Sequence, residues 1–167
     1  QKGAVYLTAL HSSAWFALMQ GDYGVARSSY DFCLRLAQEL KVKDIVASSL
    51  AGLGHLALER DDVTTARSFY EQSLALERAI KNDLGISACL NSLGNIADGQ
   101  EDYVAARIFF EESLAIDREL GNDLGIAIRL GNLGMVALEQ GDVASARVYL
   151  NEALAIRKAL GDKRGLA

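Results

Sequence analysis

The side chains best suited to binding chemistry recur at intervals of forty residues. The single tryptophan, Trp15, is followed at that interval by His55, Asn95 and Met135. A second column, four residues earlier, holds His11, Ala51, Asn91 and Gly131, and a third, three residues earlier, holds Ser12, Gly52, Ser92 and Asn132. Asparagine offers a donor and an acceptor to an extended peptide backbone, and aromatic anchors are frequent at interfaces. We therefore predict a protein- or peptide-binding surface, formed by His11, Trp15, His55, Asn91, Asn95, Asn132 and Met135.

Two other interpretations of these columns remain open at this point. Trp15 could pack against a neighbouring helix, and the asparagines could be solvated without any ligand. The two histidines, His11 and His55, could bind a metal, but no third ligand has a suitable spacing, so we predict no metal site. A role of these histidines in sensing pH is not indicated by the sequence.

Catalytic motifs are missing from the sequence. There is no glycine-rich phosphate loop, no cluster of metal ligands and no nucleophile–base–carboxylate set. The carboxylates recur as expected for helix caps and surface ion pairs, and a residue repeated in every copy is a poor candidate for a unique active site. We predict that the protein is not an enzyme and needs no cofactor.

The forty-residue spacing extends over the whole chain without insertion or deletion. Four positions illustrate it in all four copies: Asp22, Asp62, Asp102, Asp142; Ala26, Ala66, Ala106, Ala146; Leu34, Leu74, Leu114, Leu154; Leu10, Leu50, Leu90, Leu130. A period in this range indicates a solenoid or another repeat array.

Each copy has the apolar spacing of two helices. Leu90, Leu93, Gly94 and Ala97 follow the helical period, and a second helical pattern begins after Asp102, which is well placed as an N-cap. The residue before this aspartate is glycine in two copies and acidic in the other two, so we expect a left-handed backbone there to be tolerated and not required. Gly94 costs about 1 kcal/mol of helix propensity, which suggests that two helix backbones meet at this glycine.

These residues resemble the tetratricopeptide repeat. The pattern reads Leu90, Leu93-Gly94, Ala97, Glu101-Asp102, Ala106, Phe110 and Ser113-Leu114, in a copy six residues longer than the common repeat of about 34. Arginine or lysine replaces the usual late proline, at Arg78, Arg118 and Lys158. The longer copies are similar to the forty-residue variety of bacterial signalling ATPases, transcriptional regulators and kinesin-light-chain-like adaptors.

The resemblance implies an all-α fold, a right-handed α-solenoid of four antiparallel helix–turn–helix units whose first helices line a concave groove. We place these units in one array over residues 1–167, at about 7–46, 47–86, 87–126 and 127–160, with 161–167 beginning a truncated fifth unit. The basic clamp that chaperone-cofactor repeats use for acidic tails is missing, since Thr8, His11 and Ser12 occupy its positions in the first copy.

Charge and composition restrict the partner classes further. The net charge of −5 comes without a basic stripe, which disfavours nucleic acid, and no apolar run is long enough to cross a membrane. Cys33 and Cys89 fall at apolar positions and predict buried thiols in the reducing cytoplasm. The recurrent arginines have carboxylates four residues on, as in Arg27–Asp31, Arg67–Glu71 and Arg107–Glu111, which predicts exposed ion pairs in preference to an anion site.

Two functions follow from these patterns together with what the family resemblance implies. The first is a non-catalytic scaffold that binds a protein or peptide in the groove, as part of a longer protein. The alternative is a regulatory segment of a bacterial signalling ATPase or transcriptional regulator that self-associates. In that case Leu154 and Ile156, less covered than their equivalents, form a homo-oligomer through the uncapped ends.

Overall fold

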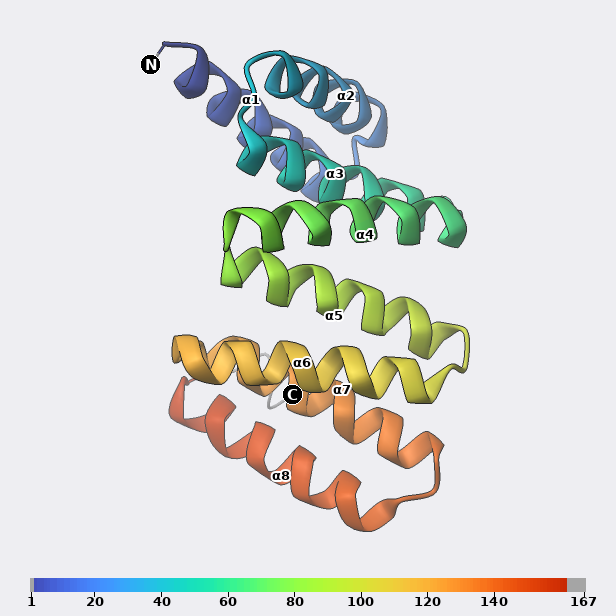
Figure 1. Cartoon of the computed structure of the whole chain (residues 1–167). Coiled ribbons are helices and arrows are strands. Elements are labelled where there is room, and N and C mark those ends of the chain that lie inside the picture. The colour runs from blue at the N-terminus through green and yellow to red at the C-terminus, as the bar shows by residue number, and fades with distance from the viewer. Residues whose placement is uncertain (1, 162–167) are drawn as a thin grey trace. The chain divides into compact units, whose positions relative to one another are not determined.

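The computed structural model describes residues 2–161, with side chains from Tyr6 onward, and this part of the chain is all-helical (Figure 1). It contains eight α-helices joined by short turns and no strand. The chain divides into two compact units, Gln1–Gly85 and Ile86–Ala167. The predicted all-α helical-repeat fold is confirmed, and each unit is described below by itself.

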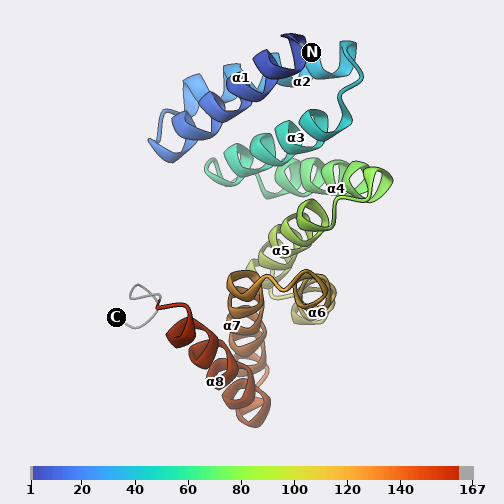
Figure 2. The same cartoon turned by 90° about the vertical axis from the view of Figure 1, so that its left-hand side faces the viewer.

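The first unit consists of two helical hairpins. Its helices are α1 (Lys2–Met19), α2 (Tyr23–Glu39), α3 (Lys43–Leu58) and α4 (Val63–Ile80). Helices α1, α2 and α3 lie side by side, and α4 packs against α3 (Figure 2). Tyr30 of α2 is fully buried in a core that also contains Ala14 of α1 and Leu53 of α3. Helix α2 therefore packs against α1 of its own hairpin and against α3 of the following hairpin.

The second unit repeats this arrangement. It contains most of α5 (Asp83–Gly99), then α6 (Tyr103–Leu120), α7 (Asp123–Glu139) and α8 (Val143–Ala159). Phe110 of α6 occupies the place that Tyr30 has in the first unit, and it is buried with Leu130 and Leu133 of α7. The remaining buried members of this core come from all four helices: Ala97, Ala106, Leu114, Ile126, Val136 and Ala153.

The turns share one backbone conformation that recurs every twenty residues. A left-handed residue occurs at Gly21, Lys41, Asp61, Lys81, Glu101, Gly121, Gly141 and Gly161. After the first seven of these residues, the next residue donates its N–H to the carbonyl five residues back, as in Asp102 N to Ala97 O at 2.9 Å, which is the Schellman pattern of helix ends. The left-handed conformation is therefore adopted even at the acidic Asp61 and Glu101, where the sequence suggested that it was only tolerated.

Helix starts agree with the predicted caps. The carboxylates of Asp22, Asp62, Asp102 and Asp142 each accept a backbone N–H three residues on, at 3.0–3.1 Å. The helices α3, α5 and α7 begin at Lys43, Asp83 and Asp123, four residues before the unit boundaries expected from the sequence. Most of the expected fifth unit, residues 162–167, lies outside the described residues. No helix in the described part of the chain is long and apolar enough to span a membrane.

Candidate functional site

The columns singled out in the sequence lie on the first helix of each hairpin. In the first unit Trp15 of α1 lies beside His55 of α3, with ring centroids 6.5 Å apart and ring planes at 76°. Trp15 keeps 44% of its surface exposed. The tryptophan therefore both contacts a neighbouring helix and presents a ring to solvent, so the two interpretations of this residue are compatible.

His11, which the sequence placed on the predicted binding surface together with His55, is less exposed than expected. Its ring packs edge-on against buried Tyr30, at a centroid distance of 5.4 Å, and its Nε2 is buried. Burial lowers the pKa of His11, and a hydrogen bond to the Ser48 backbone opposes this effect. The His11 side chain is therefore half-buried and packs against Tyr30, whereas the His55 side chain is exposed.

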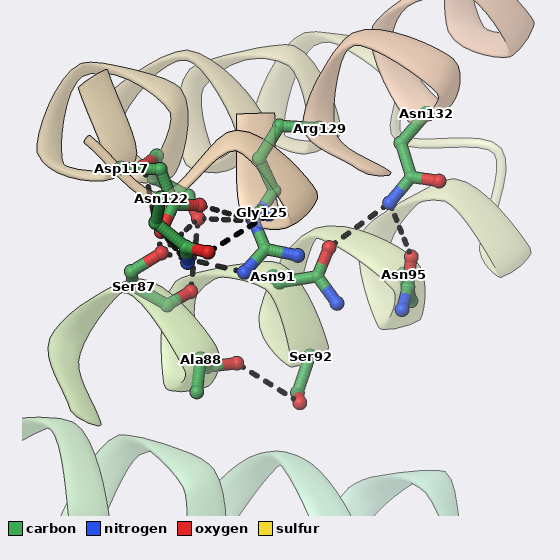
Figure 3. A network of polar contacts seen from close by, with 11 residues as sticks. Ser87, Ala88, Asn91, Ser92, Asn95, Asp117, Asn122, Gly125, Arg129 and Asn132 are labelled. Atoms are coloured by element: carbon green, nitrogen blue, oxygen red, sulfur yellow. Dashed lines mark hydrogen bonds and ion pairs between the residues drawn. The ribbon is translucent and has the colours of Figure 1, made fainter. Parts of the chain in front are cut away.

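Three asparagines form a cluster in the second unit (Figure 3). Asn132 of α7 donates its Nδ2 to Oδ1 of Asn91 at 2.9 Å and to Oδ1 of Asn95 at 3.3 Å, both on α5. The bonds fix how the amides point, and among the described contacts they leave the Asn132 Oδ1 and the Nδ2 groups of Asn91 and Asn95 for a ligand. Met135, one turn after Asn132 and half exposed, extends the surface. The asparagines are therefore organised and not merely solvated.

We call the surfaces that carry these residues the first-helix faces. In the first unit the face comprises Thr8, His11, Ser12, Trp15 and Met19 of α1, with Asp44, Ser48, Ala51, His55 and Glu59 of α3 and its C-cap. In the second unit it comprises Ala88, Asn91, Ser92, Asn95 and Asp98 of α5, with Leu124, Ile128, Gly131, Asn132, Met135, Leu138 and Glu139 of α7. These positions fall within about 60° of the Trp15 column at 100° per residue.

A buried polar network lies beside the asparagine cluster (Figure 3). Arg129, one turn before Asn132 on α7, donates from Nε to Ser113 of α6 at 2.7 Å and from a terminal nitrogen to Ser87 of α5 at 3.3 Å. Its Nε also lies 3.2 Å from Oδ2 of Asp117, an ion pair in which the guanidinium is 9% exposed and the carboxylate fully buried. Burial lowers the pKa of Arg129, and the Asp117 charge raises it. One side chain thereby connects the three helices α5, α6 and α7.

Asp117 is held from a second direction as well. Asn122, the N-cap of α7, donates its Nδ2 to Asp117 Oδ1 at 2.8 Å and accepts the Gly125 N–H at 3.2 Å. In the first unit buried Glu77 has the equivalent position and accepts from Asn82 at 2.8 Å. The sequence-based expectation that carboxylates serve only as caps and surface pairs is therefore wrong for these two, because each lies where a second helix meets the following turn.

Sequence reasoning missed this network, although it contained a signal. The position of Arg129 holds the small residues Ala9, Ser49 and Cys89 in the earlier copies, whereas that of Asp117 holds Ala37 and Glu77 in earlier copies and Arg157 in the last. A charged residue that replaces small ones at a repeated inward position, as Arg129 does, indicates a buried pair. Of the predicted surface ion pairs, Arg27–Asp31 is present, with Nε of Arg27 3.7 Å from Oδ2 of Asp31. Arg107, which was predicted to pair with Glu111, donates a hydrogen bond to Gln140.

Chemically, the faces offer amide, aromatic and thioether groups to a ligand. No group of three or more His, Cys, Asp or Glu side chains that could hold a metal occurs among the described residues.

On α8, the last helix of the second unit, Leu154 is 37% exposed, whereas its equivalents Leu74 and Leu114 are 7% and 5% exposed. Ile156 is intermediate in exposure, as are its equivalents, so only Leu154 shows the expected loss of cover.

Comparison with known proteins places this arrangement among repeat proteins. A family model described as Tetratricopeptide repeat matches residues 46–119 and 86–159. No curated protein matches the sequence.

Among solved structures, BtubC (BKLC) from P. vanneervenii aligns with a TM-score of 0.83 at 20% identity, over 96% of this chain and 66% of that one. Aspartyl phosphate phosphatase F from Bacillus subtilis gives 0.88 at 12% identity, over 95% and 42%. TPR-like repeats described as those of a kinesin light chain from Podosopora anserina give 0.74 at 16% identity, over 92% and 76%. The chain thus spans about two thirds of the first protein and under half of the second. These identities show a shared fold.

Proposed function

The chain belongs to the tetratricopeptide repeat family, and we propose that it binds an extended protein or peptide segment on its first-helix faces without catalysing a reaction. Members of this family generally serve as scaffolds for protein interactions. The name of one structural neighbour is that of a phosphatase, but at 12% identity the likeness concerns the fold and carries no activity to this chain.

The observation that carries the proposal is the asparagine cluster. Asn91, Asn95 and Asn132 reach the surface, yet hydrogen bonds between helices hold their amides in fixed orientations. An extended backbone presents alternating carbonyl and N–H groups, which such an arrangement can bind with little loss of side-chain entropy on association. Small neighbours at Ala88, Ser92 and Gly131 leave space for a chain to approach.

The test is selection of short random peptides displayed on phage against the immobilised protein. We expect enriched sequences whose binding weakens about tenfold in Asn95→Ala, since truncating a central interface side chain typically costs 1 kcal/mol or more. Trp15→Ala should weaken those peptides that contact the first unit. Glu111→Ala, an exposed change on α6 away from the faces, is the control. If no sequence is enriched, or if enriched peptides bind all variants equally, the first-helix faces are not the binding surface.

A second candidate function is self-association through α8, whose exposed Leu154 side chain is the residue to test. Sedimentation velocity at several protein concentrations tests it. The expected result is a sedimentation coefficient that rises with concentration and returns to the monomer value in Leu154→Glu. A concentration-independent monomer excludes this function and leaves peptide binding unaffected.

The cytoplasm remains our predicted compartment. It rests on Cys33 and Cys89, which are both buried thiols and lie in different units. Buried thiols of this kind are typical of proteins in a reducing environment. Secretion of the full-length protein into an oxidising medium would contradict this assignment.

A further inference from the structure

The charges on the first-helix faces have one sign. Four carboxylates lie on them: Asp44, Glu59, Asp98 and Glu139. The chain has 17 lysines and arginines in all, yet none of those whose side chains the structure describes lies on these faces. Lys43, Arg60 and Arg129 adjoin face residues in the sequence. At 100° per residue, Lys43 and Arg129 project about 120° from the columns of His55 and Met135, and Arg60 follows the C-cap of α3. The faces are thus acidic in both units, independently of the net charge of the chain.

These carboxylates are available to a partner. Asp44, Glu59 and Glu139 are exposed and Asp98 is partly exposed, and among the described contacts none of the four pairs with lysine or arginine. Glu59 accepts only a neutral hydroxyl, from Tyr23 at 2.5 Å. In the second unit the pKa of Tyr103 is raised, chiefly by desolvation and further by the negative charges of Glu139, Glu101 and Asp98. Both units therefore combine uncompensated negative charge with hydrogen-bonding groups.

We infer that the segment bound on the first-helix faces is cationic, with lysine or arginine side chains directed at Asp44 and Glu59 in the first unit and at Asp98 and Glu139 in the second. This inference rests on the proposed function and adds the chemistry of the partner. The exposed ring of Trp15 suits the same partner, because a lysine or arginine over an indole face gains a cation–π interaction. An acidic segment would meet two like charges in either unit, with no cation among the described residues of that face to offset them.

The peptide selection described above tests this inference when the net charge of the enriched sequences is compared with that of the input library. We expect enrichment of lysine and arginine. The tightest fluorescein-labelled peptide should then bind at least about threefold more weakly when NaCl is raised from about 0.05 M to about 0.5 M, since salt screens exposed charges.

Two variants with the same net charge distinguish the effect of the carboxylates on the first-helix faces from the effect of the protein's overall charge. The first neutralises the faces through Asp44→Asn, Glu59→Gln, Asp98→Asn and Glu139→Gln. The second neutralises four carboxylates of second helices through Glu39→Gln, Glu71→Gln, Glu111→Gln and Glu119→Gln. We expect the face variant to weaken peptide binding roughly tenfold and the control to change it less than about twofold, given that each exposed pair contributes little alone. Circular dichroism and thermal melting check that both variants remain folded.

The outcomes distinguish the inference from the function on which it rests. Enrichment of neutral or acidic peptides, or equal weakening in the two charge variants, overturns the cationic partner while peptide binding stands. Absence of any enriched peptide overturns both. Cationic peptides that lose affinity only in the face variant support both.

Discussion

At the scale of single residues, the glycine that recurs in the first helices, Gly54, Gly94 and Gly134, packs against the side chain opposite it. A Cβ placed on Gly94 would lie 2.5 Å from Cε1 of the buried Phe110, and one on Gly134 would lie 2.6 Å from Leu150. At Gly54 the nearest ring, that of Tyr70, is 3.1 Å away. The repeated glycine is therefore explained by side chains of the second helix that cover it, and not by the backbone contact that its spacing suggested.

This packing predicts opposite effects for the same substitution at two glycines. Gly94→Ala should destabilise the protein by about 1–2 kcal/mol, because overpacking against Phe110 exceeds the gain in helix propensity. Gly131→Ala, in the middle of α7 with nothing within 4 Å of its Cβ, should stabilise it by about 0.5–1 kcal/mol. Urea denaturation measures both, and Gly94→Leu should be worse than Gly94→Ala. A Gly94→Leu protein as stable as wild type contradicts the packing described.

Glu77 predicts a pH dependence of stability. Burial raises its pKa above the ordinary glutamate value, the Asn82 hydrogen bond lowers it, and the charge of Asp44 raises it. Because the folded-state pKa is raised, the group favours folding below its unfolded pKa, and this contribution is lost as the pH rises through the folded pKa. Glu77→Gln should therefore match wild type near pH 4 and become the more stable protein toward pH 7. Urea denaturation across this range measures the difference, and a constant difference would show that Glu77 is not the titrating group.

At the scale of secondary-structure elements, the sequence allowed the helices and the starts of the second helices to be predicted well. Aspartate caps and apolar spacing act locally, so they can be recognised in one repeat and checked in the others. Turn conformation was less predictable, because acidic or lysine residues occupy left-handed positions such as Glu101 and Lys81. The Schellman hydrogen bonds and the following cap impose that conformation on whichever residue is present.

The turns provide a reciprocal test of this point. Lys81 and Gly121 are equivalent left-handed C-caps with φ of 58° and 65°. Lys81→Gly should stabilise the protein by about 0.5–1 kcal/mol, since relief of left-handed strain exceeds the entropy cost of glycine. Gly121→Lys should destabilise it by a similar amount, and the double exchange should be close to neutral. Thermal and urea unfolding of the three variants measure these effects, and equal signs for the two single changes would refute the account.

The network around Arg129 could not be predicted from one repeat, because its members come from three helices and differ from their equivalents. It also positions the candidate site, since Arg129 and Asn132 lie one turn apart on α7. The asparagines themselves were identified from the sequence, as they lie on a face that periodicity defines. Their mutual hydrogen bonds were not, because contacts between helices depend on how the hairpins pack.

We expect Arg129→Leu to destabilise the protein by about 3–5 kcal/mol, because it leaves the buried Asp117 carboxylate without its counter-charge. Adding Asp117→Asn should recover part of this loss, since the asparagine is neutral and keeps an acceptor for Asn122. Urea denaturation of both single variants and the double variant gives the coupling energy. Additive effects would show that the ion pair contributes nothing beyond its separate members.

At the scale of the whole molecule, the two compact units each have their own core, centred on Tyr30 in Gln1–Gly85 and on Phe110 in Ile86–Ala167. Repeat proteins gain stability from each unit and its nearest neighbours, so damage to one core should remain local. Phe110→Ala, which removes about 3–5 kcal/mol of packing, should raise amide hydrogen exchange in α5–α8 while α1–α3 keep their protection. Tyr30→Ala is the matched variant and should produce the reverse pattern. Mass spectrometry of exchanged peptides resolves the two regions, and uniform loss of protection in both variants would mean that the chain unfolds as one cooperative body.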